Sequence, residues 1–222
     1  MVEQLSYLLR DREWMLFVDG ENFTKRGQAI LKAAGVKPEP GTYWQRDTYL
    51  WLPLRAARDP FFAAFRSMFL PHSAGGRDAR LARRAYFYTS ATADEPDSRV
   101  HRLALRALGF EPRLFKRQQG RSKAVDIALT TEVLTLASED RYELAVIFAG
   151  DGDYVPLIEA VKRLGQYVVL GFFAESGLSP ELQIAADEFV DLGPVLVQSW
   201  VNYLEGLERE RQTTAPEATP EA

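Results

Sequence analysis

The sequence predicts an α/β fold built on a mostly parallel sheet. Short continuous apolar runs alternate along the chain with segments of helical periodicity, which is the pattern of successive βαβ units. An apolar run without polar alternation indicates a strand that is covered on both faces. Two of these runs end abruptly in acidic turns, Asp19-Gly20 and Gly150-Asp151-Gly152-Asp153. Because parallel sheets bind ligands outside the carboxyl ends of their strands, these turns are the first candidates for a site.

Five strands and the helices between them follow from hydrophobic patterning and turn residues. The strands are expected at residues 14–18, 85–89, 111–115, 144–149 and 166–173. Helices are expected at residues 22–34, 94–108, 123–137, 154–164, 180–187 and 195–211. Two further helices are expected at 2–9 and, with a proline in the first turn, at 60–70.

The length of 222 residues suits one domain, predicted here over residues 1–211. Residues 36–84 are rich in proline and aromatic side chains and are interpreted as an atypical insertion. Residues 212–222 are rich in Pro, Ala, Thr and Glu and are expected to form a disordered acidic tail.

Composition narrows the chemistry. The chain has 27 Lys+Arg against 31 Asp+Glu, a net charge of -4, so a bulk basic footprint for nucleic acid is absent. With no cysteine, disulfides, thiolate zinc sites and a Cys nucleophile are excluded, and two histidines supply little for a multi-His metal site. The N-terminus lacks the pattern of a signal peptide and no apolar stretch is long enough to span a membrane, so a cytoplasmic location is expected.

The first acidic turn is Phe-Val-Asp-Gly-Glu-Asn, residues 17–22. The strand delivers Asp19 to the edge of the sheet, and Asn22 is expected to cap the next helix or to contact a metal-bound water or a phosphate. Asp19 and Asn22 also suit an ordinary strand-to-helix turn, so this motif alone leaves both interpretations open.

The second acidic turn places Asp151 and Asp153 one glycine apart. Asp153 is expected to cap the helix that begins at Tyr154, whereas Asp151 has no such local role. Two neighbouring carboxylates repel each other unless a cation lies between them, so a cation site and a purely structural turn are both open for this motif alone.

A third motif, Lys-Ala-Val-Asp-Ile-Ala-Leu, begins a helix at Lys123. Asp126 lies in its first turn, where its charge suits the helix dipole and where it could project toward the strand ends. Glu132 is six positions further on, off the helical stripe of Asp126, and is either a solvated residue or a more distant member of the cluster. Lys123 is either a surface lysine or a contact to phosphate.

Carboxylates at segment ends suit a hard divalent cation. Mg²⁺ and Mn²⁺ take oxygen ligands and work with phosphate substrates, and they support displacement at phosphorus. A basic segment that includes Lys116, Arg117, Arg121 and Lys123 precedes the helix with Asp126 and could hold a phosphodiester backbone, although such a run is also typical of a solvated face.

The three motifs, in this order, resemble the NYN domain, the LabA/DUF88-like branch of the PIN-like nucleases. The resemblance spans about residues 14–192, without the 36–84 insertion, and includes Ser176–Leu192. It implies a Rossmann-like, PIN-like three-layer sandwich with a mostly parallel sheet of about five to six strands. It also implies a Mg²⁺- or Mn²⁺-dependent ribonuclease, with RNA as partner. Carried over by motif, the catalytic and metal-binding residues would be Asp19, Asp126, Asp151 and Asp153, and Asn22 would belong to the site. Where the family often has a further Asp, this chain has Glu132.

Two alternatives stay open at this stage. A haloacid-dehalogenase-type phosphatase shares the order of strand Asp, Lys and Gly-Asp, but it needs a second Asp at position 21, where this chain has Glu. A non-catalytic domain that binds RNA or protein is the other alternative. A homodimer, and a protein partner bound through the 36–84 insertion, also stay open.

Overall fold

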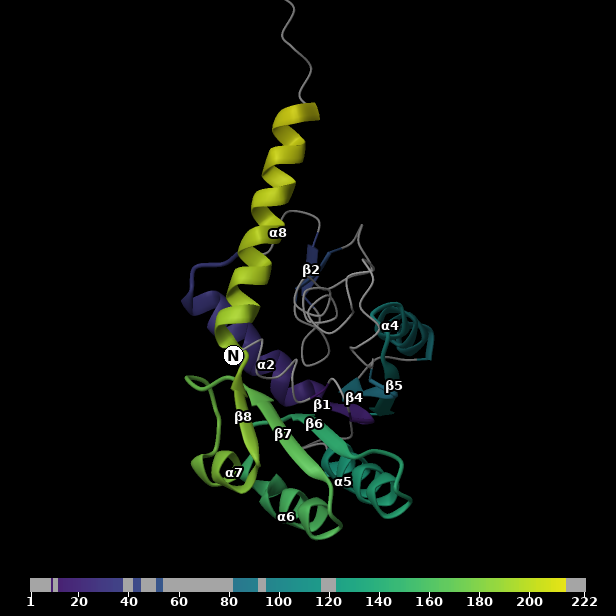
Figure 1. Ribbon diagram of the computed structural model, residues 1–222. Coiled ribbons are helices and arrows are strands. Elements are labelled where there is room, and N and C mark those ends of the chain that lie inside the picture. The colour runs from purple at the N-terminus through teal and green to yellow at the C-terminus, as the bar shows by residue number, and fades with distance from the viewer. Residues whose placement is uncertain are drawn as a thin grey trace, which may run out of the picture.

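Six strands form one parallel sheet at the centre of the molecule (Figure 1). The computed structural model describes residues 9, 12–37, 42–44, 51–53, 82–91, 95–116 and 123–214. The strands lie in the order β5-β4-β1-β6-β7-β8, and each neighbouring pair is parallel. Their bounds are β1 Trp14–Asp19, β4 Arg84–Ala91, β5 Glu111–Lys116, β6 Leu144–Phe148, β7 Tyr167–Phe172 and β8 Glu188–Asp191. The prediction of an α/β fold with a Rossmann-like parallel sheet is confirmed.

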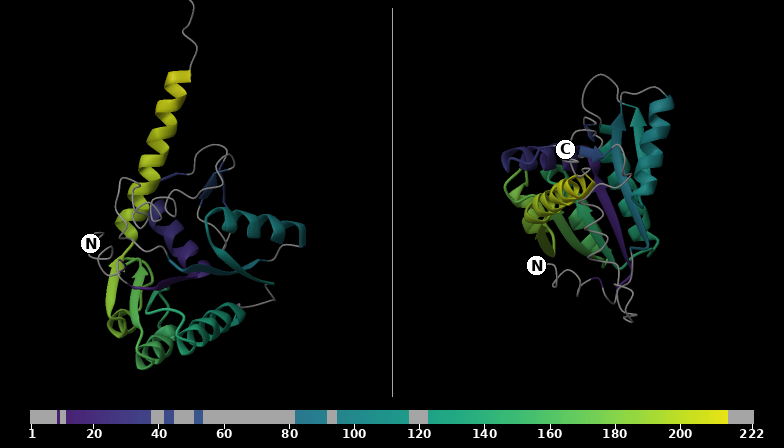
Figure 2. Two further views of the ribbon diagram at one scale, coloured as in Figure 1. Left: turned by 45° about the vertical axis from the view of Figure 1, so that its right-hand side comes forward. Right: turned by 90° about the horizontal axis from the view of Figure 1, so that it is seen from above.

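Helices cover both faces of the sheet and complete three layers (Figures 1 and 2). On one face pack α2 (Gly20–Ala33), α4 (Glu95–Ala107) and α8 (Gly193–Thr214). On the other pack α5 (Lys123–Ser138), α6 (Val155–Arg163) and α7 (Pro180–Ala185). The alternation along β1 serves both layers, because Leu16 and Val18 contact the first and Met15 and Phe17 the second.

The chain changes direction across the sheet between β1 and β6. After β1 it adds β4 and β5 on one side, and it then returns to add β6, β7 and β8 on the other side of β1. The connections on either side of this point leave a crevice at the carboxyl ends of β1 and β6, which is where open α/β sheets bind ligands. Both acidic turns lie at this switch point.

The sixth strand, β8, was not predicted from the sequence. β8 has only four residues, its side chains are half-buried, and it ends in Asp191, so it carries neither an apolar run nor a full alternation. It pairs with β7 at the edge of the sheet, where one partner strand is enough to fix it. The prediction of about five to six strands is confirmed, because the sheet has six.

Two helix starts were predicted wrongly. α2 begins at Gly20 rather than at Asn22, because the chain turns directly from strand to helix and Asp19 itself is the cap. Gly20 permits this turn, since a Cβ there would overlap the ring of Phe87. After β6, a 3-10 turn (η1, Gly152–Tyr154) precedes α6, and Asp151 rather than Asp153 caps that turn.

Parts of the predicted insertion and termini lie outside the described residues. Within residues 36–84 the structure describes an antiparallel pair, β2 (Thr42–Trp44) and β3 (Trp51–Pro53). The helix expected at 60–70 lies outside, as does the helix expected at 2–9 apart from Leu9. α8 continues to Thr214, and residues 215–222 of the predicted tail lie outside. The division into one domain, an insertion and a tail stays a prediction.

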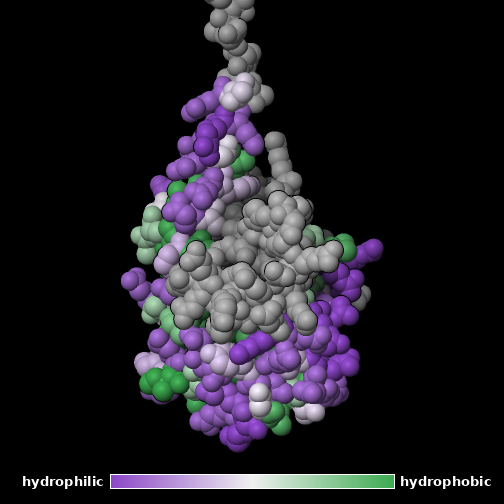
Figure 3. All heavy atoms as spheres, in the orientation of Figure 1, coloured by the Kyte–Doolittle hydropathy of each residue, from purple (hydrophilic) through white to green (hydrophobic). Residues whose placement is uncertain are grey.

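The long helix α8 is anchored at its start and projects from the body at its end (Figures 1 and 2). Trp200 is fully buried against the sheet, whereas the side chains of residues 208–213 are exposed. Over α5 and α6 the surface in Figure 3 is mainly hydrophilic, with a small hydrophobic area at α7, where Ile184 is 81% exposed. Among the described helices, none combines the length and apolarity that crossing a bilayer requires.

Candidate active site

Asp19 and the Gly-Asp-Gly-Asp turn lie at the same edge of the sheet. β1 and β6 are hydrogen-bonded parallel neighbours with Val18 opposite Phe148, so the residues that follow both strands emerge together. The sequence left open whether these two strands are neighbours, and the structure pairs them directly. Asp126, from the first turn of α5, reaches the same edge through a shared contact with Tyr154.

Asp19 is the most buried acid of the group, with 4% of its surface exposed. Its Oδ1 accepts a hydrogen bond from the backbone N–H of Asn22 at 3.1 Å and so caps α2. Its Oδ2 lies 3.2 Å from the hydroxyl of Tyr154. Burial raises the pKa of Asp19 to about 7, and the negative charge of Asp126 adds to this, while the two hydrogen bonds act in the opposite direction.

Tyr154 joins two acids that are distant in the chain. Its buried hydroxyl lies 3.0 Å from Oδ1 of Asp126 as well as near Asp19. One hydroxyl carries one proton and can donate it to only one carboxylate at a time. Partial burial raises the pKa of Asp126, and the charges of Asp151, Glu21 and Asp153 raise it further. The acids therefore repel one another, and the Tyr154 hydroxyl relieves this only in part.

Asp151 and Asp153 are both exposed, but they differ in their position relative to the cavity in front of the acids. Asp151 accepts from the N–H of Asp153 at 3.1 Å and lines the cavity described below. The prediction that Asp151 has no local role was wrong, because it caps the 3-10 turn. Asp153 is not among the residues that line the cavity, although its charge is near enough to raise the pKa of Asp126.

An open cavity of about 500 Å³ lies in front of these acids. It is bounded by β1, the first three turns of α2, the start of α5 and Asp151. Four carboxylates face it, those of Asp19, Glu21, Asp126 and Asp151. The cavity continues along α2 past Asn22 to Lys25, Arg26 and Ala29, so its acidic end is followed by a basic one.

Asn22 also lines this cavity. Its Oδ1 is buried and has no hydrogen-bond partner among the described residues. A buried carbonyl oxygen without a donor is costly, which indicates that a donor or a cation belongs there.

The residue types fit a hard divalent cation, since each donor is an oxygen. Within the described part of the chain, however, no group of three or more His, Asp or Glu residues is arranged to hold a metal ion.

Three side chains of the site were not singled out from the sequence. Tyr154 was seen only as the start of a helix, and nothing in its spacing signals that its hydroxyl reaches Asp19. Glu21 accepts from Lys25 at 2.7 Å and from Ser90 at 3.0 Å, which ties α2 to β4. Arg26 lies one turn after Asn22, and this i, i+4 spacing was the available signal.

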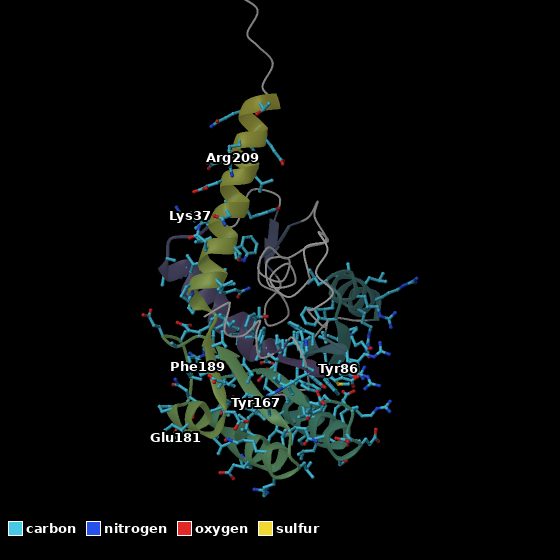
Figure 4. The ribbon with its side chains drawn as sticks, in the orientation of Figure 1. Lys37, Tyr86, Tyr167, Glu181, Phe189 and Arg209 are labelled. Carbon is cyan, nitrogen blue, oxygen red and sulfur yellow. The ribbon has the colours of Figure 1, made fainter. Side chains whose placement is uncertain are left out.

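Glu132 lies apart from the cavity. Its carboxylate accepts from the guanidinium of Arg113, at 2.8 Å for Nε, and from the hydroxyl of Tyr88 at 2.9 Å. Arg113 in turn lies over the ring of Tyr86, labelled in Figure 4, at 4.9 Å from its centroid. Glu132 is therefore neither a solvated residue nor a distant member of the acidic cluster. It joins α5 to β4 and β5 through a half-buried ion pair.

The predicted basic contacts are described only in part. Lys116 is exposed at the end of β5. Lys123 begins α5, but its side chain lies outside the described residues, as do Arg117 and Arg121.

Comparison with known proteins gives a family. A profile of the NYN domain matches residues 14–193. The chain belongs to the NYN domain family. This is a PIN-like family generally assigned to nucleases, and its acidic site typically holds a metal. The matched range begins at β1 and ends at the start of α8, so it contains both acidic turns and Asp126.

A solved structure supports the fold of this NYN domain. This chain is similar to the crystal structure of a protein of unknown function from Vibrio parahaemolyticus, with a TM-score of 0.54 and 19% sequence identity. The match covers 83% of this chain and 94% of the other. At this identity the likeness concerns the fold alone. A comparison with curated proteins found no match.

Proposed function

We propose that this NYN domain is a metal-dependent ribonuclease that hydrolyses RNA phosphodiester bonds at the acidic cavity, with Mg²⁺ or Mn²⁺. The observation that carries the proposal is the convergence of Asp19, Asp126 and Asp151 on one open cavity at the switch point of the sheet. Carboxylates that repel one another beside an open cavity are stabilised by a cation, and a phosphate substrate can share that cation. When bound, the metal would activate water and offset charge on the leaving oxygen.

Each residue has a role in this proposal. Asp19, Asp126 and Asp151 hold the cation directly or through water, and Asp153 orients water from the rim. Asn22 contacts phosphate or a metal-bound water, and its unpartnered Oδ1 supports this. Tyr154 keeps Asp19 and Asp126 facing the same volume. Lys116, Arg117, Arg121 and Lys123 hold the RNA backbone.

The geometry does not favour the phosphatase alternative. The position where that mechanism needs a second Asp is Glu21, which pairs with Lys25. A non-catalytic RNA-binding domain remains as one outcome of the test below.

The test compares cleavage of end-labelled RNA by the parent protein and by Asp126→Asn, in Mn²⁺, Mg²⁺ or EDTA. We expect cleavage only with metal, and a fall of about 100-fold or more in the variant, since the metal contributes several kcal/mol to such reactions. Asp140→Asn is the matched control. It removes one carboxylate from an exposed turn with φ of 55°, a conformation that Asn tolerates.

Two results would contradict the proposal. Equal activity of Asp126→Asn and the parent would show that the acidic cavity is not the active site. RNA binding without cleavage under each metal would establish the non-catalytic alternative.

A further inference from the structure

We infer that Arg26 binds a second phosphate of the RNA strand, next to the one at the acidic cavity, and that Gly177 makes room for it. The inference rests on the proposed function, because it assumes that the cavity receives a nucleic acid. It assigns a binding role to a residue outside the basic segment at 116–123.

The first observation is the polarity of the cavity. Its acidic end lies at Asp19 and its basic end lies one helical turn along α2, at Lys25 and Arg26. Asn22 and Arg26 are four residues apart, a rise of about 6 Å along the helix axis. This step is comparable to the spacing of neighbouring phosphates along a single strand, so a strand lying along α2 would bring one phosphate to each end.

The second observation is that Lys25 and Arg26, the two cations at the basic end of the cavity, differ in their ion pairing. Lys25 forms an ion pair with Glu21 at 2.7 Å, so its charge is largely offset. Among the described residues, no carboxylate lies within ion-pair distance of Arg26. Arg26 therefore keeps its full charge and its planar set of donors, which suits a phosphate group.

The third observation concerns the loop against which the Arg26 side chain packs. Gly177 lies in the loop between β7 and α7 with φ of 75°, and a Cβ there would overlap Nε and Cζ of the Arg26 side chain. The guanidinium end of Arg26 thus lies directly against the backbone of this loop.

The same loop is fixed to the second acidic turn. The N–H of Ser179 donates to the carbonyl of Gly150 at 2.8 Å, and a Cβ on Gly150 would come within 2.6 Å of the Gly177 carbonyl oxygen. Arg26 and Asp151 are therefore both positioned by the turn that follows β6.

The first test measures RNA binding in EDTA, where no cleavage occurs. Fluorescence anisotropy with a labelled single strand should give about tenfold weaker binding for Arg26→Ala and partial recovery for Arg26→Lys. The slope of log K against log salt should fall by about 0.7 on losing one phosphate contact. Lys32→Ala is the matched control, because Lys32 is an exposed cation on α2 that does not line the cavity.

The second test uses Gly177→Ala, which should push Arg26 from its place. Binding should weaken about as much as in Arg26→Ala, and the double variant should lose no more than either single one. Additive losses would mean that the substitution only strains the loop, and they would remove Gly177 from the inference.

The third test asks whether the contact is to phosphate. Two RNAs are compared with the unmodified RNA, each with one neutral methylphosphonate linkage, placed one bond before or one bond after the cleavage site. One of the two should have a higher KM with the parent protein than the unmodified RNA has. The same linkage should leave KM of Arg26→Ala unchanged, with kcat little altered in both.

The outcomes separate this inference from the proposed function. Equal binding by Arg26→Ala, Lys32→Ala and the parent would overturn the inference while leaving cleavage intact. Absence of cleavage with normal, Arg26-dependent binding would overturn the ribonuclease proposal alone. Absence of both RNA binding and metal-dependent cleavage by the parent would overturn both, and absence of binding in EDTA with normal cleavage would overturn the inference alone.

Discussion

The hydroxyl of Tyr154 lies 3.2 Å from Oδ2 of Asp19, across 135 positions of the chain. The contact joins the end of β1 to the turn after β6, and the same hydroxyl also reaches Asp126 on α5 at 3.0 Å. Three separate motifs therefore meet at one buried proton donor. The relationship suggests how the protein keeps like charges together in the absence of a cation.

Replacing Tyr154 by Phe should expose this role. The ring stays buried while the shared donor is lost, so the free energy of unfolding in EDTA at pH 8 should fall by about 1–3 kcal/mol. The fall should be smaller at pH 5, because Asp19 is then protonated and hydrogen bonds to neutral acceptors are weaker. Urea unfolding at the two pH values measures both quantities.

Tyr142→Phe is the control for that experiment. Tyr142 is equally buried, and its hydroxyl donates to the backbone carbonyl of Val133 at 2.9 Å, away from any carboxylate. Its loss should be about 1 kcal/mol at both pH values. If the two variants behave alike, the special role of Tyr154 is wrong.

Asp19→Asn should change the pH dependence of stability. Because burial raises the pKa of Asp19 to about 7, the folded chain holds this proton more tightly than the unfolded chain does. The stability from this group is present in full below about pH 4 and is lost as pH rises through about 7. In EDTA the variant should therefore match the parent near pH 4 and exceed it by about 1–4 kcal/mol at pH 8.

Urea unfolding between pH 4 and 8 measures this difference. Asp140→Asn is the control, because it removes an exposed carboxylate that does not line the cavity. Adding Mg²⁺ should narrow the gap at pH 8, since a cation near Asp19 favours its ionised form. A gap that does not vary with pH would contradict the prediction.

Glu132→Gln should weaken the fold without removing activity. The carboxylate binds both Arg113 and Tyr88, and its side chain is 24% exposed, so we expect a loss of about 1–2 kcal/mol. Metal-dependent cleavage per folded molecule should stay within about twofold of the parent, since Glu132 does not line the cavity.

Glu159→Gln serves as its control. Glu159 pairs with Arg163 at 4.0 Å on an exposed face of α6, where ion pairs contribute little. A folded Glu132→Gln protein that has lost cleavage would place Glu132 in the active site after all.

Much of the site was predictable because it lies at the ends of strands. Parallel strands bring their carboxyl ends to one edge, so the positions of Asp19 and Asp151 followed from the apolar runs before them. Arg26 and Tyr154 were not predicted, since their roles depend on distances across the sheet and on the close approach of the 174–179 loop to α2. Glu132 could not be assigned, because its partners lie on β4 and β5, which sequence spacing does not relate to α5.

The sequence by itself determined the α/β class, five of the six strands and the motifs that carry the acids, since these depend on local patterning. The weak net charge of -4 was compatible with a nucleic-acid site but could not locate one. Only the tertiary structure decided that β1 and β6 are neighbours, that four carboxylates face one cavity and that one end of that cavity is basic. The physical reason is that strand pairing and loop packing act between residues far apart in the chain, where periodicity carries no information.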